Sequence, residues 1–93
     1  MILSFSDNVT EALFASGKHR RVPDRVSVRA KQQLDLSDAA VRLEDLYFPP
    51  SARFERLAGT NPRRYSIRVT RQYRITLEWQ GKDAENARFE DYR

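Results

Sequence analysis

The spacing of hydrophobic residues changes near the middle of the sequence, from a helical period to a strict alternation. Before Pro50, apolar residues recur every three or four positions, which is typical of helices with one buried face. After Pro50, they recur at every second position, which is typical of half-buried strands. Helices first and strands second predict the α+β class, with two N-terminal helices packed on one small, mostly antiparallel sheet.

The N-terminal residues predict a short strand at 1–5 and a first helix that ends near residue 14. The strand residues expected on one face are Met1, Leu3 and Phe5. Ser6 or Asp7 is a suitable N-cap for the helix, and the pair at 16–17 ends it. The helix residues expected to point inward are Val9, Leu13 and Phe14.

A second helix is predicted over residues 24–40, with Pro23 suited to its first turn. Its expected apolar stripe consists of Val26, Ala30, Leu34 and Leu36, and its expected outward residues are Arg25, Arg29 and Lys31. A single helical turn is predicted at 43–46. The two prolines in the segment 47–50 then favour an extended crossing, because proline cannot continue a helix.

Strands are predicted at 53–57, 65–70, 73–79 and 87–92, separated by turns. The second and third of these form the clearest hairpin, with a tight turn at 71–72. The apolar register of the hairpin consists of Tyr65, Ile67, Val69, Tyr73, Ile75, Leu77 and Trp79. We expect this register to face the helices, which places its aromatic residues in the core.

Arginine is concentrated in the segment 53–74, whose net charge is +6 although the whole chain carries +4. The seven arginines are Arg53, Arg56, Arg63, Arg64, Arg68, Arg71 and Arg74, and the only acid is Glu55. The planar guanidinium fork binds phosphate through two hydrogen bonds and stacks on bases. This local excess favours a nucleic-acid or ribosomal partner, against the alternative of a basic surface without a ligand.

Arg68 and Arg74 both lie off the apolar register of the hairpin. We therefore expect them to share the sheet face that points away from the helices. Two guanidinium groups on one open face form a cationic site of the size of a phosphate. The alternative is that they form ordinary cross-strand ion pairs, with Glu55, Glu78 or Glu90 as the partner.

Residue counts exclude several kinds of site. There is no cysteine and only one histidine, which excludes disulfides, thiolate metal sites and multi-histidine metal sites, and we expect neither a metal nor a cofactor. His19 lies in the basic segment 18–21, either as a solvated loop residue or as a catalytic base. No signal peptide and no apolar run of membrane-spanning length is recognisable, so we expect a soluble, cytoplasmic protein without membrane contact.

A series of motifs extends along nearly the whole chain. They are the opening Met-Ile-x-Ser-Phe, Leu34-Asp35 to Ala39-Ala40, Leu43-Glu44-Asp45-Leu46 followed by Pro49-Pro50, Arg53-Phe54-Glu55-Arg56-Leu57-x-Gly59, Tyr65-Ser66-Ile67-Arg68-Val69, Tyr73-Arg74-Ile75, and the terminal Asp91-Tyr92. In their joint order and spacing, these motifs resemble the HigB-type plasmid-maintenance killer proteins of the RelE toxin superfamily.

The resemblance implies that residues 1–93 form a single RelE/HigB-like toxin domain, with two helices on a curved, mostly antiparallel sheet. It implies the toxin of a bacterial type II toxin–antitoxin system, an endoribonuclease that cleaves mRNA in the ribosomal A site. It also implies a HigA-type helix-turn-helix antitoxin as partner, through which the toxin joins operator DNA.

The chain departs from the family pattern at three positions. It ends in Arg93 where members commonly end in histidine, it has Ala58 where many have lysine, and it has Glu55 where some have histidine. A usual acid–base group and a usual cation are therefore missing.

Two functions stay open: an mRNA endonuclease of full or reduced activity, or a non-catalytic or weakly active ribosome- and RNA-binding homologue. The antitoxin would neutralise either one and co-repress with it.

In a metal-independent reaction, the ribose 2′-hydroxyl attacks the adjacent phosphate. The candidate groups are Glu55 or Asp91 as general base, Tyr92 or Arg93 as proton donor or stabiliser, and Arg56, Arg68 and Arg74 as phosphate ligands. The arginines expected to bring the protein onto RNA are Arg53, Arg63, Arg64 and Arg71, the last three from turns. Structural roles remain as alternatives: Glu55 or Asp91 pairs with a sheet arginine, and Tyr92 covers the sheet edge or stacks on a base.

Overall fold

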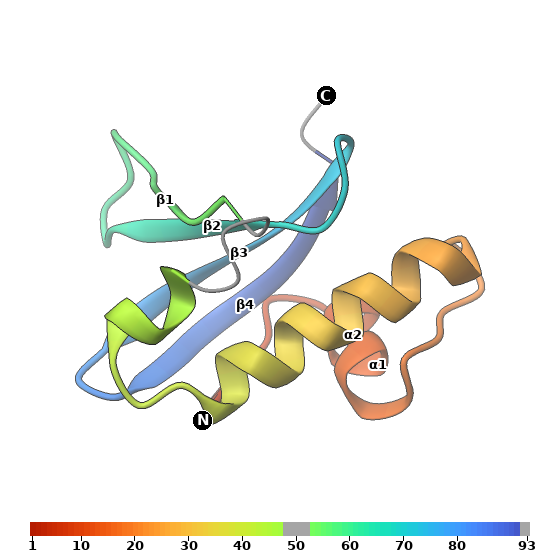
Figure 1. Cartoon of the computed structure of the whole chain (residues 1–93), viewed down its shortest axis with the longest axis horizontal. Helices are drawn as coiled ribbons and strands as arrows, with labels where there is room; N and C mark the ends of the chain where they lie inside the picture. Colours follow the sequence, from red (N-terminus) through yellow and green to blue (C-terminus); the bar gives the residue numbers. More distant parts are fainter. Residues whose placement is uncertain (48–52, 92–93) are drawn as a thin grey trace.

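Two helices cover one face of a curved antiparallel sheet in the computed structural model of the chain (Figure 1). The structure describes residues 1–47 and 53–91. Its helical elements are α1 (Asn8–Ser16), α2 (Asp24–Ala39) and the 3-10 helix η1 (Leu43–Tyr47). Its strands are β1 (Glu55–Arg56), β2 (Arg64–Arg68), β3 (Tyr73–Gln80) and β4 (Asp83–Asp91), which pair in the order β1-β2-β3-β4. The predicted α+β class is confirmed.

Helix α1 has a capping residue at each end. The Asp7 Oδ1 atom accepts a hydrogen bond from the Thr10 amide at 2.8 Å, which confirms that Asp7 is the N-cap. Gly17 adopts a φ of 74°, and its amide donates to the Leu13 carbonyl at 2.9 Å. A Cβ atom at this position would be strained and would lie 2.9 Å from the Lys31 Cδ atom, so the turn requires glycine.

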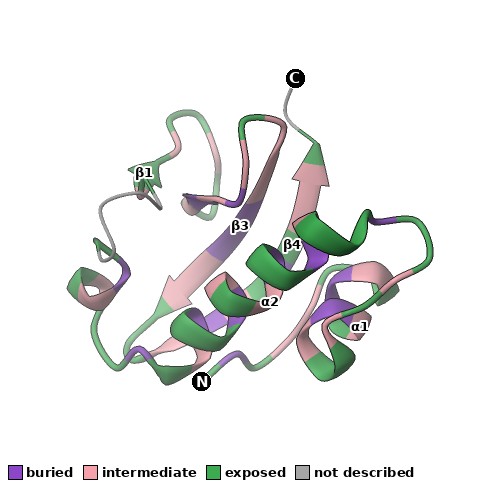
Figure 2. Cartoon of the chain, turned by 45° about the vertical axis from the view of Figure 1, so that its right-hand side comes forward, coloured by how far each residue is buried: buried purple, intermediate pink, exposed green. Residues whose placement is uncertain are grey.

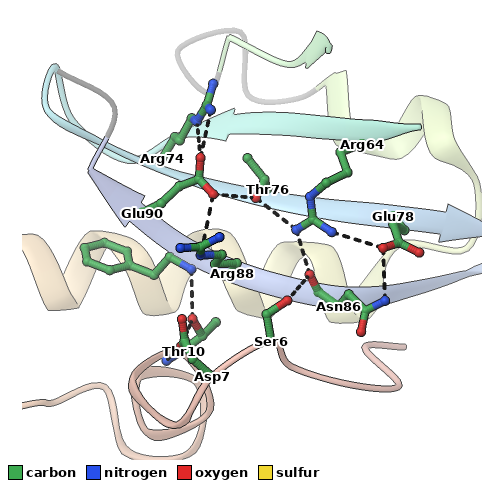
Figure 3. A network of polar contacts seen from close by, with 11 residues as sticks. Ser6, Asp7, Thr10, Arg64, Arg74, Thr76, Glu78, Asn86, Arg88 and Glu90 are labelled. Carbon is green, nitrogen blue, oxygen red and sulfur yellow. Dashed lines mark hydrogen bonds and ion pairs between the residues drawn. The ribbon is translucent and has the colours of Figure 1, made fainter. Parts of the chain in front are cut away.

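Thr10 connects α1 to the sheet. Its side chain is fully buried, and its hydroxyl donates to the Asp7 Oδ1 atom at 2.7 Å. The same hydroxyl accepts from the Phe89 amide of β4 at 2.8 Å (Figure 3). One buried side chain thus provides the acceptor that a strand amide needs and fixes the cap of the helix against that strand.

Helix α2 packs its buried face on the sheet. The buried residues are Ser27, Ala30, Leu34 and Ser37, which recur every three or four positions. Both serine hydroxyls donate to carbonyl groups of the preceding helical turn, so they can be buried without water. The prediction that Leu36 belongs to this face is wrong. Leu36 is 46% exposed because it lies two positions from Leu34, about 200° around the helix axis.

The N-terminal residues lie parallel to β4, but they bury a different face from the predicted one. Ile2 is opposite Ala84, which is fully buried. Since residues opposite each other point to the same side of a sheet, Ile2 is also buried, and its neighbours Met1 and Leu3 are exposed. Of the three residues predicted on the buried face, only Phe5 packs against the core.

The strand boundaries differ from the predicted ones at both ends of the sheet. Arg53 has a φ of 44°, which is not a strand conformation, so β1 begins at Glu55 and is two residues long. The last strand begins at Asp83 instead of residue 87. A register shift between Thr76 and Glu78 interrupts the ladder between β3 and β4, so the start of β4 carries no simple alternation.

The predicted helical turn at 43–46 is confirmed as η1. The Asp45 Oδ2 atom accepts from the amides of Val41 and Arg42 at 3.0 and 3.1 Å. These two backbone hydrogen bonds lower the pKa of the Asp45 carboxyl below its ordinary value. Of the extended crossing predicted at 47–50, Tyr47 belongs to η1, and the other residues lie outside the described part of the chain.

The helix-facing side of the sheet forms the core with the helices (Figure 2). The most deeply buried strand residues in the predicted apolar register are Ile67, Ile75 and Leu77, none more than 2% exposed. The aromatic residues of that register, Tyr65, Tyr73 and Trp79, are half-buried and pack against this core. The Tyr73 ring stacks on Phe89 with centroids 5.0 Å apart. The helices leave the other face of the sheet uncovered.

Thr10→Val keeps the shape of the side chain and removes the hydroxyl. We expect the free energy of unfolding to fall by about 1–3 kcal/mol, because the partly buried Phe89 amide loses its acceptor. Urea denaturation followed by circular dichroism measures the change. Thr10→Ser, which keeps the hydroxyl, is the matched control and should lose less. A valine variant as stable as the natural chain would show that this hydroxyl does not stabilise the fold.

Candidate nucleic-acid interface

A cleft of about 270 Å³ opens on the sheet face that the helices leave uncovered. Its lining residues are Arg53, Glu55, Ser66, Arg68 and Arg74. Arg68 of β2 and Arg74 of β3 are direct partners in the antiparallel ladder. Because directly opposed residues point to the same side, the prediction that these two arginines share one face is confirmed.

The short edge strand β1 supplies the acid of the cleft. Glu55 is opposite Ser66 in the ladder between β1 and β2, so its side chain lies on the cleft face. Arg56 is opposite Tyr65, whose register faces the helices. Among the described residues, Glu55 forms no ion pair with Arg68 or Arg74, so the alternative that it pairs with a sheet arginine is not found.

Arg74 is held at the cleft by Glu90 of β4, its direct neighbour in the sheet. The Arg74 Nε and Nη2 atoms donate to the Glu90 Oε1 atom at 2.9 and 2.7 Å. The two side chains are only 25% and 21% exposed. For Arg74, the predicted alternative of a cross-strand ion pair with Glu90 is therefore correct. The pair neutralises part of the charge of Arg74 and fixes the direction of its guanidinium group.

Arg68 has a different environment. Its Nε atom donates to the Thr70 carbonyl at 3.3 Å, and no ion pair joins it to a carboxylate in the part of the chain that the structure describes. The Thr70 hydroxyl accepts from the amides of Gln72 and Tyr73, which holds the connection between β2 and β3 in place. Within the described residues, Glu90 is the carboxylate bound to the arginine pair, and the described lining of the cleft keeps a net positive charge.

The Arg74–Glu90 pair belongs to a network that crosses three strands (Figure 3). The Glu90 Oε2 atom accepts from the Thr76 hydroxyl at 3.0 Å, and that hydroxyl accepts from the Arg64 Nη2 atom at 2.9 Å. Arg64 also donates to Glu78 at 3.1 Å. Thr76 is 1% exposed, so the centre of the network is shielded from water. Hydrogen bonds are stronger in such a shielded environment than in water. Arg74 cannot rotate away without breaking this chain of bonds.

The predicted turn position of Arg64 is wrong. Arg64 is the first residue of β2 and lies opposite Glu78, with which it forms an ion pair. Its side chain is 20% exposed, and it also donates to the Asn86 carbonyl at 2.7 Å. The strand begins one residue earlier than the alternation indicated. Arg64 is therefore part of the strand, and its side chain lies on the face of the sheet. Arg63 and Arg71 lie outside the strands and are exposed, as predicted.

The C-terminal candidates are placed differently from the arginine pair. Asp91 is opposite Tyr73, so its register is the helix-facing one rather than that of Glu90. The Gln72 Nε2 atom donates to the Asp91 Oδ2 atom at 3.0 Å, and Asp91 does not line the cleft. Tyr92 and Arg93 lie outside the described residues. Of the candidate catalytic residues, the structure brings together Glu55, Arg68 and Arg74.

Two residues that shape the site were not among the candidate site residues: Ser66, which lines the cleft, and Glu90, which holds Arg74 from β4. Ser66 is 7% exposed and lies between Arg64 and Arg68 on the same face, a position that the period of two already indicates. Glu90 entered the sequence interpretation only as an alternative ion-pair partner. Its role beside Arg74 requires the register of β4 on β3, which the sequence pattern does not give.

His19 belongs to a turn outside the cleft. Its Nδ1 atom accepts from the Arg21 amide at 3.1 Å, which agrees with the loop interpretation. Within residues 1–47 and 53–91, no group of three or more histidine, cysteine or acidic side chains is arranged to hold a metal ion. Within the same residues, no helix combines the length and the apolar character needed to cross a bilayer.

Comparisons with known proteins identify the family of the chain. Residues 3–92 match the family described as the RelE-like toxin of the type II toxin–antitoxin system HigB. The chain is similar to Toxin HigB-1 of Vibrio cholerae serotype O1, with 38% identity over 80 residues, which cover 85% of this chain and 84% of that protein. An uncharacterized protein of Haemophilus influenzae is 28% identical over 68 residues, covering 73% and 67% of the two chains. The chain therefore belongs to the RelE-like HigB toxins of type II toxin–antitoxin systems.

Proposed function

We propose that this toxin is a ribosome-dependent mRNA endonuclease that inhibits translation and growth. The observation that carries the proposal is the pair Arg68 and Arg74, which are directly opposed in the sheet and line one cleft with Glu55. Like charges directly opposite each other destabilise a sheet, and a phosphate between the two guanidinium groups would offset this repulsion. RelE-like toxins generally act as endoribonucleases, which supports the same conclusion.

In the proposed mechanism, the two arginines bind the scissile phosphate and stabilise the charge that develops on its oxygens. A well-placed donor of this kind contributes roughly 3–4 kcal/mol to transition-state stabilisation. Glu90 orients Arg74 before the substrate arrives, so little reorganisation accompanies the reaction. Arg68 is anchored on the Thr70 carbonyl at the other side of the cleft.

The proton steps need a base and an acid. We assign the base to Glu55, which is exposed and lines the cleft, and keep Asp91 as the second candidate. Glu55 would take the proton of the 2′-hydroxyl, the 2′-oxygen would attack the phosphorus, and the bond to the 5′-oxygen would break. Tyr92 or Arg93 would supply the proton or the charge that the leaving 5′-oxygen needs. A positioned acid or base accelerates such a step by about 10²–10⁴-fold.

Membership of a type II toxin–antitoxin system implies an antitoxin partner. We infer that this partner is a HigA-type helix-turn-helix protein, and that the toxin reaches operator DNA only through their complex. The substrate we infer is mRNA in the ribosomal A site, so the toxin would act in the cytoplasm. The exposed arginines that would contact RNA phosphates are Arg53, which lines the cleft, and Arg56, Arg63 and Arg71, which do not line it.

Arg68→Ala and Arg74→Ala should each abolish growth inhibition when the chain is expressed alone, because each removes one of the two phosphate ligands. Growth after induction measures the effect, and circular dichroism of the purified variants checks the fold. Arg42→Ala is the matched control, since the Arg42 side chain is 71% exposed and lies outside the cleft. If either cleft variant inhibits growth as strongly as the natural chain, the phosphate-site assignment is wrong.

Glu90→Gln should lower kcat for mRNA cleavage by about 10- to 100-fold, because Arg74 loses the charged partner that orients it. KM should not rise, because the cleft gains positive charge and still attracts the phosphate. Steady-state cleavage assays on programmed ribosomes separate the two constants. In an Arg74→Lys background, the same change should have no further effect, since lysine has no fork for Glu90 to hold. Equal losses in both backgrounds would show that Glu90 does not act through Arg74.

A further inference from the structure

A second group of cations lies on the connection between α1 and α2 and on the first turns of α2. We name it the connector surface; its residues are Lys18, Arg20, Arg21, Arg25 and Arg29. All five are exposed, and the only acid in the segment 18–29 is Asp24, so this segment carries +4. The residues outside the segments 18–29 and 53–74 sum to −6. The connector surface is therefore a separate positive region in an otherwise acidic chain.

The charges of the connector surface are unpaired within the described residues. In the described part of the chain, none of the five cations of the connector surface forms an ion pair with a carboxylate. Some cations elsewhere do have carboxylate partners, namely Lys31, Arg42, Arg64, Arg74 and Arg88, whereas Arg68 at the cleft, like the connector surface, has none within the described residues. The connector surface thus keeps its full charge available for a ligand.

The positions of these cations are unfavourable for the helix that carries them. Arg25 and Arg29 are four residues apart on α2, where like charges repel across one turn. Arg25 also lies in the first turn, where the helix dipole disfavours a positive charge. Asp24, in the same turn, offsets part of the dipole effect but forms no ion pair with either arginine in the described structure. A polyanion bound at this surface would relieve both effects.

The surface is held in place by a well-defined backbone. Val22 is 7% exposed and anchors the connection in the core, and its amide donates to the His19 carbonyl at 2.9 Å. The Lys31 Nζ atom donates to the Phe14 carbonyl at 2.8 Å, which joins α2 to the end of α1. Because the backbone under the cations is already ordered, binding a ligand here costs little conformational entropy.

The connection between α1 and α2 and the edge strand β1 of the cleft lie at opposite ends of the molecule in both views (Figures 1 and 2).

We propose that the connector surface binds the phosphate backbone of ribosomal RNA and holds the toxin on the ribosome while the cleft receives mRNA. Four of its five cations are arginine, whose fork matches phosphate oxygens. A row of backbone phosphates matches several unpaired cations at once. The inference rests on the proposed function, since it requires a ribosomal site of action.

Binding of the full chain to vacant ribosomes without mRNA tests this inference separately from cleavage. The variant is Arg25→Gln/Arg29→Gln, and the matched control is Arg42→Gln/Lys82→Gln, which removes two exposed charges elsewhere. The dissociation constant is measured between 50 and 200 mM salt. The logarithm of the dissociation constant is plotted against the logarithm of the salt concentration. The slope of this plot should be about 1.5 smaller for the variant than for the natural chain. Between 50 and 200 mM salt, the variant should therefore lose roughly eightfold less affinity than the natural chain does. The slope of the control should stay at the natural value.

Equal slopes for the variant and the control would overturn the inference, as would a natural chain that does not bind vacant ribosomes. A third result would also overturn it: an unchanged ribosome slope together with weaker binding of the antitoxin would assign the surface to the antitoxin instead. Arg25→Lys/Arg29→Lys, which keeps both charges, should restore most of the slope. Failure of the arginine variants of the cleft to lose toxicity would affect only the proposed function, because ribosome binding is measured here without cleavage.

Discussion

The candidate site depends on two arginines that lie directly opposite each other on one face of a small sheet. Arg68 and Arg74 repel, and the ladder between β2 and β3 leaves them no separation in register. Glu90 offsets the repulsion through two hydrogen bonds to Arg74, and the buried hydroxyl of Thr76 links that carboxylate to Arg64. The network keeps a strong cation in a fixed direction, which is what binding of a phosphate at a defined angle requires.

The two faces of the sheet have different roles. One face is apolar and packs on α1 and α2, where Thr10 bonds to the Phe89 amide and fixes the helix against β4. Because this side stabilises the sheet, the other side can carry charged residues that are unfavourable for stability. The connector surface repeats the pattern at the helical end of the molecule, where Arg25 and Arg29 are exposed and form no ion pair within the described residues. Both positive regions are suited to phosphate, and the cleft also has an acid, Glu55, among its lining residues.

The sequence predicted the class of the fold and the arginine pair, because both follow from periodicity alone. It did not predict which residue of the N-terminal segment is buried, since the pairing of Ile2 with Ala84 depends on a contact between distant parts of the chain. The position of Arg64 in a strand was also missed, because β2 begins one residue before the alternation does. Glu90 was named only as one possible ion-pair partner, because its place opposite Arg74 depends on the strand register. A register shift between Thr76 and Glu78 determines where β4 lies on β3, and a period of two cannot reveal such a shift.

The most direct test of the account is primer extension on one reporter mRNA, in a translated and an untranslated copy, after expression of this chain alone. We expect growth arrest with new 5′ ends only in the translated copy, since the cleft is proposed to act on mRNA that the ribosome presents. Soluble, folded protein that causes neither arrest nor new 5′ ends would contradict it. That result would instead support a homologue that binds the ribosome without cleaving mRNA.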